Sequence, residues 1–398
     1  MKTGTTYLQR LMTANRRALA DAGFLVPGAA WADHGLATRD VLTPAGDDLS
    51  PRPVYAGTWR RLAGEMRAHQ GAGSVLSHEF LSFATAAQAR RIIDSFPDSE
   101  VRVILTVRDA AGVIPAQWQT NCRNGGKLPL AAFVRGIRGA LERSPDAGKS
   151  ARIFERTQSV ARMLDVWVPE VGADRVHVVT VPPRGSPPDL LWHRFASVLG
   201  VDHAACASRF DYVNCSLGFA SSELLRRINR ELGRFDRSVY DAVVKGPLAR
   251  RTLGPRSHLE RPIRLHRSGL RTAARWNRWT RSAIETAGVA VVGDLEDLPT
   301  GPPDAAAPQH LARPRPQELL EAAADARQGL VRLHAALSRE QVPTGSCETS
   351  LPVPPAGTTH TAGPAEVRAA VRELTDRIRE CFALAESDRR VAEPLGER

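Results

Sequence analysis

The sequence predicts an α/β protein with a mostly parallel central sheet. Short apolar runs at 101–107 and 176–181 have the composition of strands that are buried on both faces. Segments with helical periodicity separate these runs, and parallel strands need such crossover connections. Another helix is predicted directly after a Lys-Thr-Gly-Thr-Thr turn at residues 2–6, an arrangement suited to anion binding. The length of 398 residues allows one large domain or two ordinary ones.

The expected elements follow in chain order from the amino terminus. Leu8, Leu11, Met12 and Leu19 recur at helical spacing, and Gly23 predicts the end of that helix. Further strands are predicted at 74–77, 101–107, 176–181 and 289–292, and further helices at 86–96, 153–167, 188–199, 223–232 and 272–287. Residues 1–299 are therefore predicted to form one α/β domain.

The composition changes after residue 299. Residues 300–315 are rich in Pro and Ala, and residues 342–364 are rich in Pro, Thr and Gly. Helical periodicity returns at 318–337 and at 365–385. Residues 300–398 are therefore predicted to be an extension of two helices on loose linkers.

The charge and the cysteine content exclude several classes of protein. Lys and Arg number 54 against 43 Asp and Glu, a net charge of +11, but the arginines are scattered without interleaved aromatic residues. This distribution argues against nucleic-acid binding. No run approaches the ~18 consecutive apolar residues of a membrane span. The five cysteines lack CxxC spacing and no secretion leader is visible, so a cytoplasmic protein without structural zinc is expected.

The turn at residues 2–6 is the strongest indication of a ligand. At the start of a helix it combines backbone N–H groups, the positive end of the helix dipole, threonine hydroxyls and the ammonium of Lys2. These groups favour a phosphate or a similar anion. The turn is not a Walker A loop, because there the lysine follows the second glycine, whereas Lys2 comes first.

The run from Lys2 to Gln9, Lys-Thr-Gly-Thr-Thr-Tyr-Leu-Gln, resembles the 5′-phosphosulfate loop of sulfotransferases that use 3′-phosphoadenosine 5′-phosphosulfate (PAPS). Arg108-Asp109 follows the strand at 101–107, and the 3′-phosphate site of this family has an arginine at such a strand end. A guanidinium suits that role because it makes two parallel hydrogen bonds to phosphate oxygens. Residues 118–125, 214–218, 223–227, 244–245 and 291–295 further resemble a bacterial branch of the family. The resemblance spans Lys2 to Pro299.

This resemblance implies a P-loop-like three-layer fold and transfer of a sulfuryl group from PAPS to a hydroxyl or amine by in-line displacement, without a metal. Lys2 is expected at the bridging oxygen of the donor and Arg108 at its 3′-phosphate. The other donor-binding residues implied are Thr3, Gly4, Thr5 and Thr6. Lys245 is a further candidate for the 3′-phosphate, although a solvated surface lysine is an equal alternative. Family members place a serine where this chain has Ala116, which leaves the second 3′-phosphate ligand open.

The candidate proton acceptors lie in Ser77-His78-Glu79, directly after the strand predicted at 74–77. Some sulfotransferases place a glutamate or histidine base at this point of the fold. On an extended segment His78 and Glu79 would face opposite ways, so only one of them is expected to serve. Glu79 is favoured, because a buried structural histidine is an equal explanation for His78. His34 is a weaker candidate for lining the site, with a structural role as the main alternative.

Several questions stay open from the sequence alone. The family loop follows a central strand, but only Met1 precedes Lys2, so we expect that strand in a longer reading frame or a poorly active chain. The alternative functions are a P-loop kinase or NTPase and a degenerate, non-catalytic nucleotide-binding protein. Arg108-Asp109 also fits a surface ion pair, and the Gly-Thr-Thr turn fits a plain helix cap. No motif identifies the acceptor, so a small molecule, glycan, lipid or peptide stays open. The oligomeric state is open as well.

Overall fold

The computed structural model describes residues 2–43, 54–144, 148–206, 217–304, 306–310, 313–340 and 362–392. Two compact units make up the chain, and each is described by itself. The first unit comprises Met1–Ile114, Val134–Tyr212 and Arg267–Ala307; the second comprises Pro115–Phe133, Val213–His266 and Pro308–Arg398. This division differs from the boundary expected at residue 299, because the second unit combines a middle part of the chain with its end.

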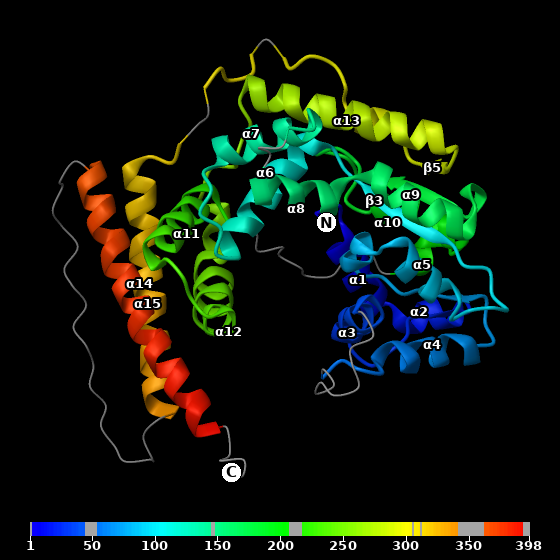
Figure 1. Ribbon diagram of the computed structural model, residues 1–398, viewed down its shortest axis with the longest axis horizontal. Helices are drawn as coiled ribbons and strands as arrows, with labels where there is room; N and C mark the ends of the chain where they lie inside the picture. Colours follow the sequence, from blue (N-terminus) through cyan, green and yellow to red (C-terminus); the bar gives the residue numbers. More distant parts are fainter. Residues whose placement is uncertain are drawn as a thin grey trace. The chain divides into compact units, whose positions relative to one another are not determined.

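The first unit contains two small sheets, and both are parallel. β1 (Phe24–Leu25) pairs with β2 (Gly73–Ser74). β3 (Val103–Val107), β4 (Val176–Thr180) and β5 (Ala290–Val292) form the second sheet in that order, with Val103 opposite Val176 and His177 opposite Ala290. The prediction of an α/β protein with parallel strands is confirmed, although helices dominate the structure (Figure 1).

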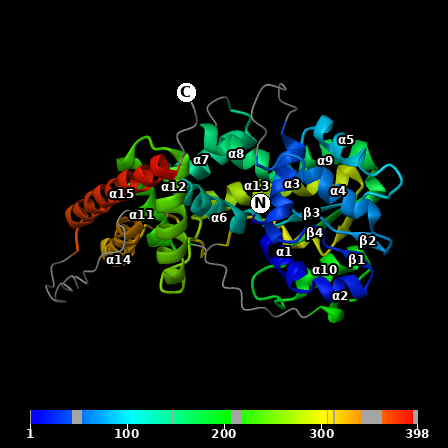
Figure 2. The same ribbon diagram turned by 90° about the horizontal axis from the view of Figure 1, so that it is seen from below.

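Helices cover both faces of the three-stranded sheet. Alternate residues of each strand point to opposite sides, so neighbouring residues pack against different helices. Val179 packs with Leu11 of α1 (Thr5–Ala14) and Trp192 of α10 (Leu190–Leu199). Its neighbour Val178 packs with Leu164 of α9 (Val160–Val171) and Ile284 of α13 (Arg267–Ala287) on the other face. The first unit is thus built as helix, sheet and helix layers, as Figure 2 shows for α10 and α13.

The remaining elements that begin in the first unit are mostly helical. They are α2 (Arg16–Asp21), α3 (Trp31–Leu42), α4 (Thr58–Ala68), the 3-10 helix η1 (Glu79–Phe83), α5 (Ala86–Ile93), α6 (Ala110–Arg123), α8 (Gly148–Gln158), η3 (Ala173–Arg175), η4 (His203–Ala205) and η7 (Leu295–Asp297). α6 runs on into the second unit, and α7 (Leu130–Leu141) begins in the second unit and ends in the first.

Two predicted helices are interrupted. The helix expected at 153–167 is wrong as one element, because Ser159 ends α8 and accepts a hydrogen bond from the Arg162 amide at 3.2 Å, which starts α9. A hydroxyl that caps a new helix start is a local competitor of the continuing helix. The first predicted helix likewise divides at Asn15 (φ −107°) into α1 and α2.

The second unit is helical. It holds α11 (Phe219–Leu232), α12 (Arg237–Tyr240), the π-helical segment η5 (Asp241–Leu253), η6 (Pro255–His258), α14 (Pro316–Glu340) and α15 (Pro364–Ala392). Ile228 of α11, Val244 of η5, Ala326 of α14 and Leu374 of α15 are fully buried in one shared core. The two C-terminal helices were expected on loose linkers, but α14 and α15 supply half of this core.

Candidate functional site

The turn before α1 has an unusual backbone. Lys2 has a φ of 64° and Gly4 a φ of 82°, so both lie in the left-handed region. Gly4 suits this position twice over, because an added Cβ would also collide with the side chain of Leu191. The Gly4 carbonyl accepts the amides of Tyr7 and Leu8 at 2.9 and 3.1 Å, which makes these the first internal bonds of the helix. The amides that precede them lie at the positive end of the helix dipole, where anions bind.

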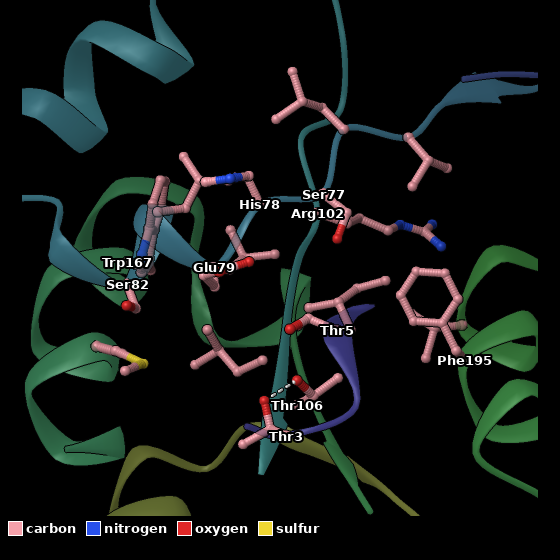
Figure 3. Close-up of a pocket in the computed structure, with 18 of the residues that line it drawn as sticks. Thr3, Thr5, Ser77, His78, Glu79, Ser82, Arg102, Thr106, Trp167 and Phe195 are labelled. Carbon is pink, nitrogen blue, oxygen red and sulfur yellow. Dashed lines mark hydrogen bonds between the residues drawn. The ribbon is translucent and has the colours of Figure 1, made fainter. Parts of the chain in front are cut away.

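A threonine holds this turn to the end of the central sheet. Thr3 is buried, and its Oγ1 lies 2.8 Å from Oγ1 of Thr106 near the carboxyl end of β3 (Figure 3). Arg108 follows two residues later and donates from Nη1 to the Lys2 carbonyl at 3.3 Å. The structure therefore brings the predicted anion turn and the predicted phosphate-binding arginine into direct contact.

The Arg108 guanidinium lies in an electropositive environment. Burial lowers its pKa, the charge of Arg184 lowers the pKa further, and Asp109 acts in the opposite direction. The Asp109 carboxylate is occupied elsewhere, because its Oδ1 accepts the Ala111 amide at 2.9 Å and the Asn277 side-chain amide at 2.8 Å. Asp109 thus starts α6, so a plain surface ion pair does not describe this dipeptide. An anion bound beside Arg108 would relieve the repulsion between two cations.

Arg184 is a candidate that the sequence interpretation missed. It lies in the Pro-Pro-Arg-Gly segment that follows β4. Ligands of open α/β sheets bind at the carboxyl ends of parallel strands. Arg184 follows the strand predicted at 176–181 after two prolines, so its position near a strand end indicated a ligand-binding residue, as the position of Arg108 did for the strand at 101–107.

His78 and Glu79 both line one cavity of about 630 Å³ together with Thr3 and Thr5 (Figure 3). Arg108 lines it as well. The extended backbone stops at His78, and Glu79 begins the 3-10 helix η1, so strand alternation does not run through both residues. That only one of them serves as the base stays a prediction. Burial lowers the pKa of His78, and the neighbouring Glu79 opposes that shift. His78 Nδ1 accepts the Phe80 amide at 3.3 Å, so this nitrogen already has a structural role.

His34 has the structural role that was its main alternative. It is buried in α3, its Nδ1 accepts the Ser77 amide at 3.2 Å, and its Nε2 lies 3.0 Å from the Pro27 carbonyl. Burial lowers its pKa, which keeps the ring neutral with one donor and one acceptor. Gln9 of α1 donates to the Ser77 carbonyl at 3.0 Å. His34 and Gln9 together fix Ser77, and Ser77 precedes the candidate bases.

The same cavity separates the two sheets. It is lined by residues 73–77 around β2 and by 101–107 around β3, with Trp59, Met163 and Phe195 among the apolar side chains between them. β2 pairs only with β1 and β3 only with β4 among the described strands. Each of these two strands therefore has one edge without a described partner, and the loop at Thr3 lies at the carboxyl end of β3.

Lys245 and Ala116 lie in the second unit. The Lys245 ammonium pairs with Asp241 of the same π-helical segment at 2.8 Å, and the Ala116 carbonyl accepts the Thr120 hydroxyl at 3.1 Å. Their roles at a 3′-phosphate stay predictions. Asn214, Cys215 and Ser216, which contributed to the resemblance, lie outside the described residues.

The described ranges hold no group of three or more His, Cys, Asp or Glu side chains arranged to bind a metal ion. None of their helices combines the length and the apolar composition needed to cross a membrane.

Comparison with known proteins adds no family. No family model matches the chain, and no curated protein and no solved structure matches it either.

Proposed function

We propose that this chain is a sulfotransferase that moves a sulfuryl group from PAPS to a hydroxyl or amine of an acceptor. The observation that carries the proposal is the contact between the anion turn and Arg108, whose Nη1 lies 3.3 Å from the Lys2 carbonyl. PAPS carries two anionic groups, a phosphosulfate and a 3′-phosphate, so it needs two neighbouring cationic sites. The helix start at Thr5 suits the first group. The partly buried Arg108, whose pKa is lowered by the charge of Arg184, suits the second.

The proposed reaction is an in-line displacement at sulfur. The acceptor oxygen or nitrogen forms a bond to sulfur while the bond from sulfur to the bridging oxygen breaks, and 3′-phosphoadenosine 5′-phosphate leaves. The ammonium of Lys2 neutralises the charge that develops on the leaving oxygen. Glu79, with His78 as the alternative, takes the acceptor proton, a contribution worth roughly 10²–10⁴-fold in rate. The activated donor supplies the group, while the protein positions it and stabilises charge.

The finer fold that we propose is the P-loop-like three-layer fold with one more parallel strand between β2 and β3. The cavity of about 630 Å³ between these strands supports it, because its walls are two strand edges and apolar side chains of flanking helices. Backbone groups on such edges need hydrogen-bond partners, and a strand of about 5–6 residues would supply them. The carboxyl end of this strand would lead into the Lys2 turn, which Thr3 fastens to Thr106.

The proposal predicts specific binding of the spent donor. Isothermal titration of the purified chain with 3′-phosphoadenosine 5′-phosphate should give saturable binding without magnesium, and Lys2→Ala or Arg108→Ala should weaken it at least tenfold. Each substitution removes one charge-assisted phosphate contact. Arg60→Ala is the matched control, because Arg60 is exposed on α4 and lies outside the cavity lining.

Three outcomes separate the competing functions. Absence of binding by the unaltered chain rejects the sulfotransferase proposal. Magnesium-dependent binding of ATP in place of the spent donor assigns the site to a kinase or NTPase. Binding without any transfer from labelled PAPS to components of a cell extract would favour the degenerate nucleotide-binding protein.

A further inference from the structure

The second unit contains a groove surrounded by arginine side chains. It has a volume of about 410 Å³ and lies along α11 and α15, which pack against each other. The guanidinium-bearing residues that line it are Arg226, Arg227, Arg230, Arg368 and Arg372. Glu231, Pro364 and Val371 complete the lining.

Helical spacing places these arginines together. Arg226 and Arg230 are four residues apart on α11, as are Arg368 and Arg372 on α15, so each pair shares one helix face. The opposite faces hold the two helices in place through fully buried Ile228 and Leu374. The groove therefore rests on a packed core, and its position does not depend on a loop.

The arginines exceed the carboxylates around the groove. Glu223 is shared by Arg226 and Arg227, at 2.6 and 2.9 Å. Arg230, Arg368 and Arg372 form no ion pair within the described part of the chain. Glu231 lines the groove and Glu366 lies in the first turn of α15, so with Glu223 five arginines stand against three carboxylates, an excess of two positive charges. Clustered like charges destabilise a folded protein unless a counter-ion neutralises them.

The helix dipole adds to this positive potential. Pro364, a lining residue, is the first residue of α15, which is 29 residues long. The amino end of a helix carries a partial positive charge. Glu366 lies in this first turn, but its Oε2 accepts the Gly363 amide at 3.0 Å and serves as a cap.

We propose that this groove binds a phosphate monoester dianion. Guanidinium groups bind tetrahedral oxyanions through paired N–H donors, and Arg230, Arg368 and Arg372 offer three such groups from two helices. Arg226 supplies a fourth guanidinium group, which is more buried. Glu223 and a hydrogen bond of 3.2 Å to the Lys127 carbonyl orient it. The site lies wholly in the second unit and does not rest on the function proposed for the first.

The test uses the full chain carrying Arg108→Ala, so that binding at the first unit is suppressed. Titration with inorganic pyrophosphate at low ionic strength should give one saturable site, and added Arg368→Gln and Arg372→Gln should weaken it at least tenfold. Arg332→Gln is the charge-matched control, because Arg332 is exposed on α14 and lies outside the groove lining. Circular dichroism checks that each variant keeps its helix content.

The proposal is overturned if pyrophosphate does not saturate, if the double variant binds as tightly as its parent, or if Arg332→Gln weakens binding to the same degree. Two further measurements distinguish a free phosphate ester from a lipid headgroup. Competition by glycerol phosphate supports a free ligand, whereas cosedimentation with phosphatidic acid vesicles alone supports a lipid headgroup at the same arginines.

Discussion

Arg108 has the environment expected of a residue that binds an anion at the expense of stability. Its guanidinium is partly buried, the charge of Arg184 lowers its pKa, and the adjacent carboxylate of Asp109 is engaged by Ala111 and Asn277. A buried charge without a dedicated partner is costly in a folded protein. Groups of this kind concentrate at functional sites, because the ligand supplies the missing counter-charge.

At the same scale, His34 makes stability depend on pH. Burial lowers its pKa in the folded state, so the unfolded chain binds the proton more readily. Stability should therefore fall as the pH drops below the ordinary histidine value of about 6.5. His34→Gln should reduce the loss in melting temperature between pH 7.5 and pH 5.5, measured by thermal unfolding.

The control for this prediction is His310→Gln, because His310 is exposed. That variant should retain the full pH dependence of the unaltered chain. An equal pH dependence in the His34→Gln chain would show that the His34 ring does not contribute to the acid sensitivity. His78 shares the direction of the shift, so some sensitivity should remain in either case.

At the scale of elements, the turn before α1 depends on Gly4. Gly4→Ala would place a Cβ in the left-handed region and against Leu191. A non-glycine residue in such a conformation costs about 1–3 kcal/mol, and we expect a loss of that size in the free energy of unfolding. Binding of 3′-phosphoadenosine 5′-phosphate should weaken as well, because the amides of the turn would move.

Gly64→Ala gives the matched comparison for that measurement. Gly64 lies inside α4, and an added Cβ there meets no heavy atom within 4 Å. Alanine in a helix interior is favoured over glycine by about 0.5–1 kcal/mol, so this variant should gain stability in urea unfolding. A Gly4→Ala chain that behaves like Gly64→Ala would contradict the strained turn.

At the scale of the whole molecule, the space between β2 and β3 is the feature that the proposed fold must explain. Extending the chain before Lys2 with a strand-forming segment of about six apolar residues should raise the melting temperature by several degrees. The segment would bury apolar side chains against Trp59, Met163 and Phe195 and would pair two strand edges. An extension of Gly and Ser of the same length should leave the melting temperature unchanged, and equal values for both would reject the strand.

Local patterns in the sequence were sufficient to predict the parallel strands at 101–107 and 176–181, because runs of buried β-branched residues depend on near neighbours. The turn at residues 2–6 and the arginine after β3 were identified for the same reason. The breaks at Asn15 and Ser159 were not. The Asn15 side chain bonds back to the Leu11 carbonyl, and the Ser159 side chain caps α9; such local bonds compete with helix continuation only when the surrounding packing favours them.

The sequence by itself thus determined the pattern of parallel strands and located the turn at residues 2–6 and the arginine after β3, which the proposed site combines. Only the tertiary structure decided that the charge of Arg184 lowers the pKa of Arg108, that His78 and Glu79 line one cavity, and that α14 and α15 contribute to the core of the second unit. These outcomes join residues far apart in the chain. Periodicity reports which face of an element is buried, but contacts between elements depend on how all of the faces pack together.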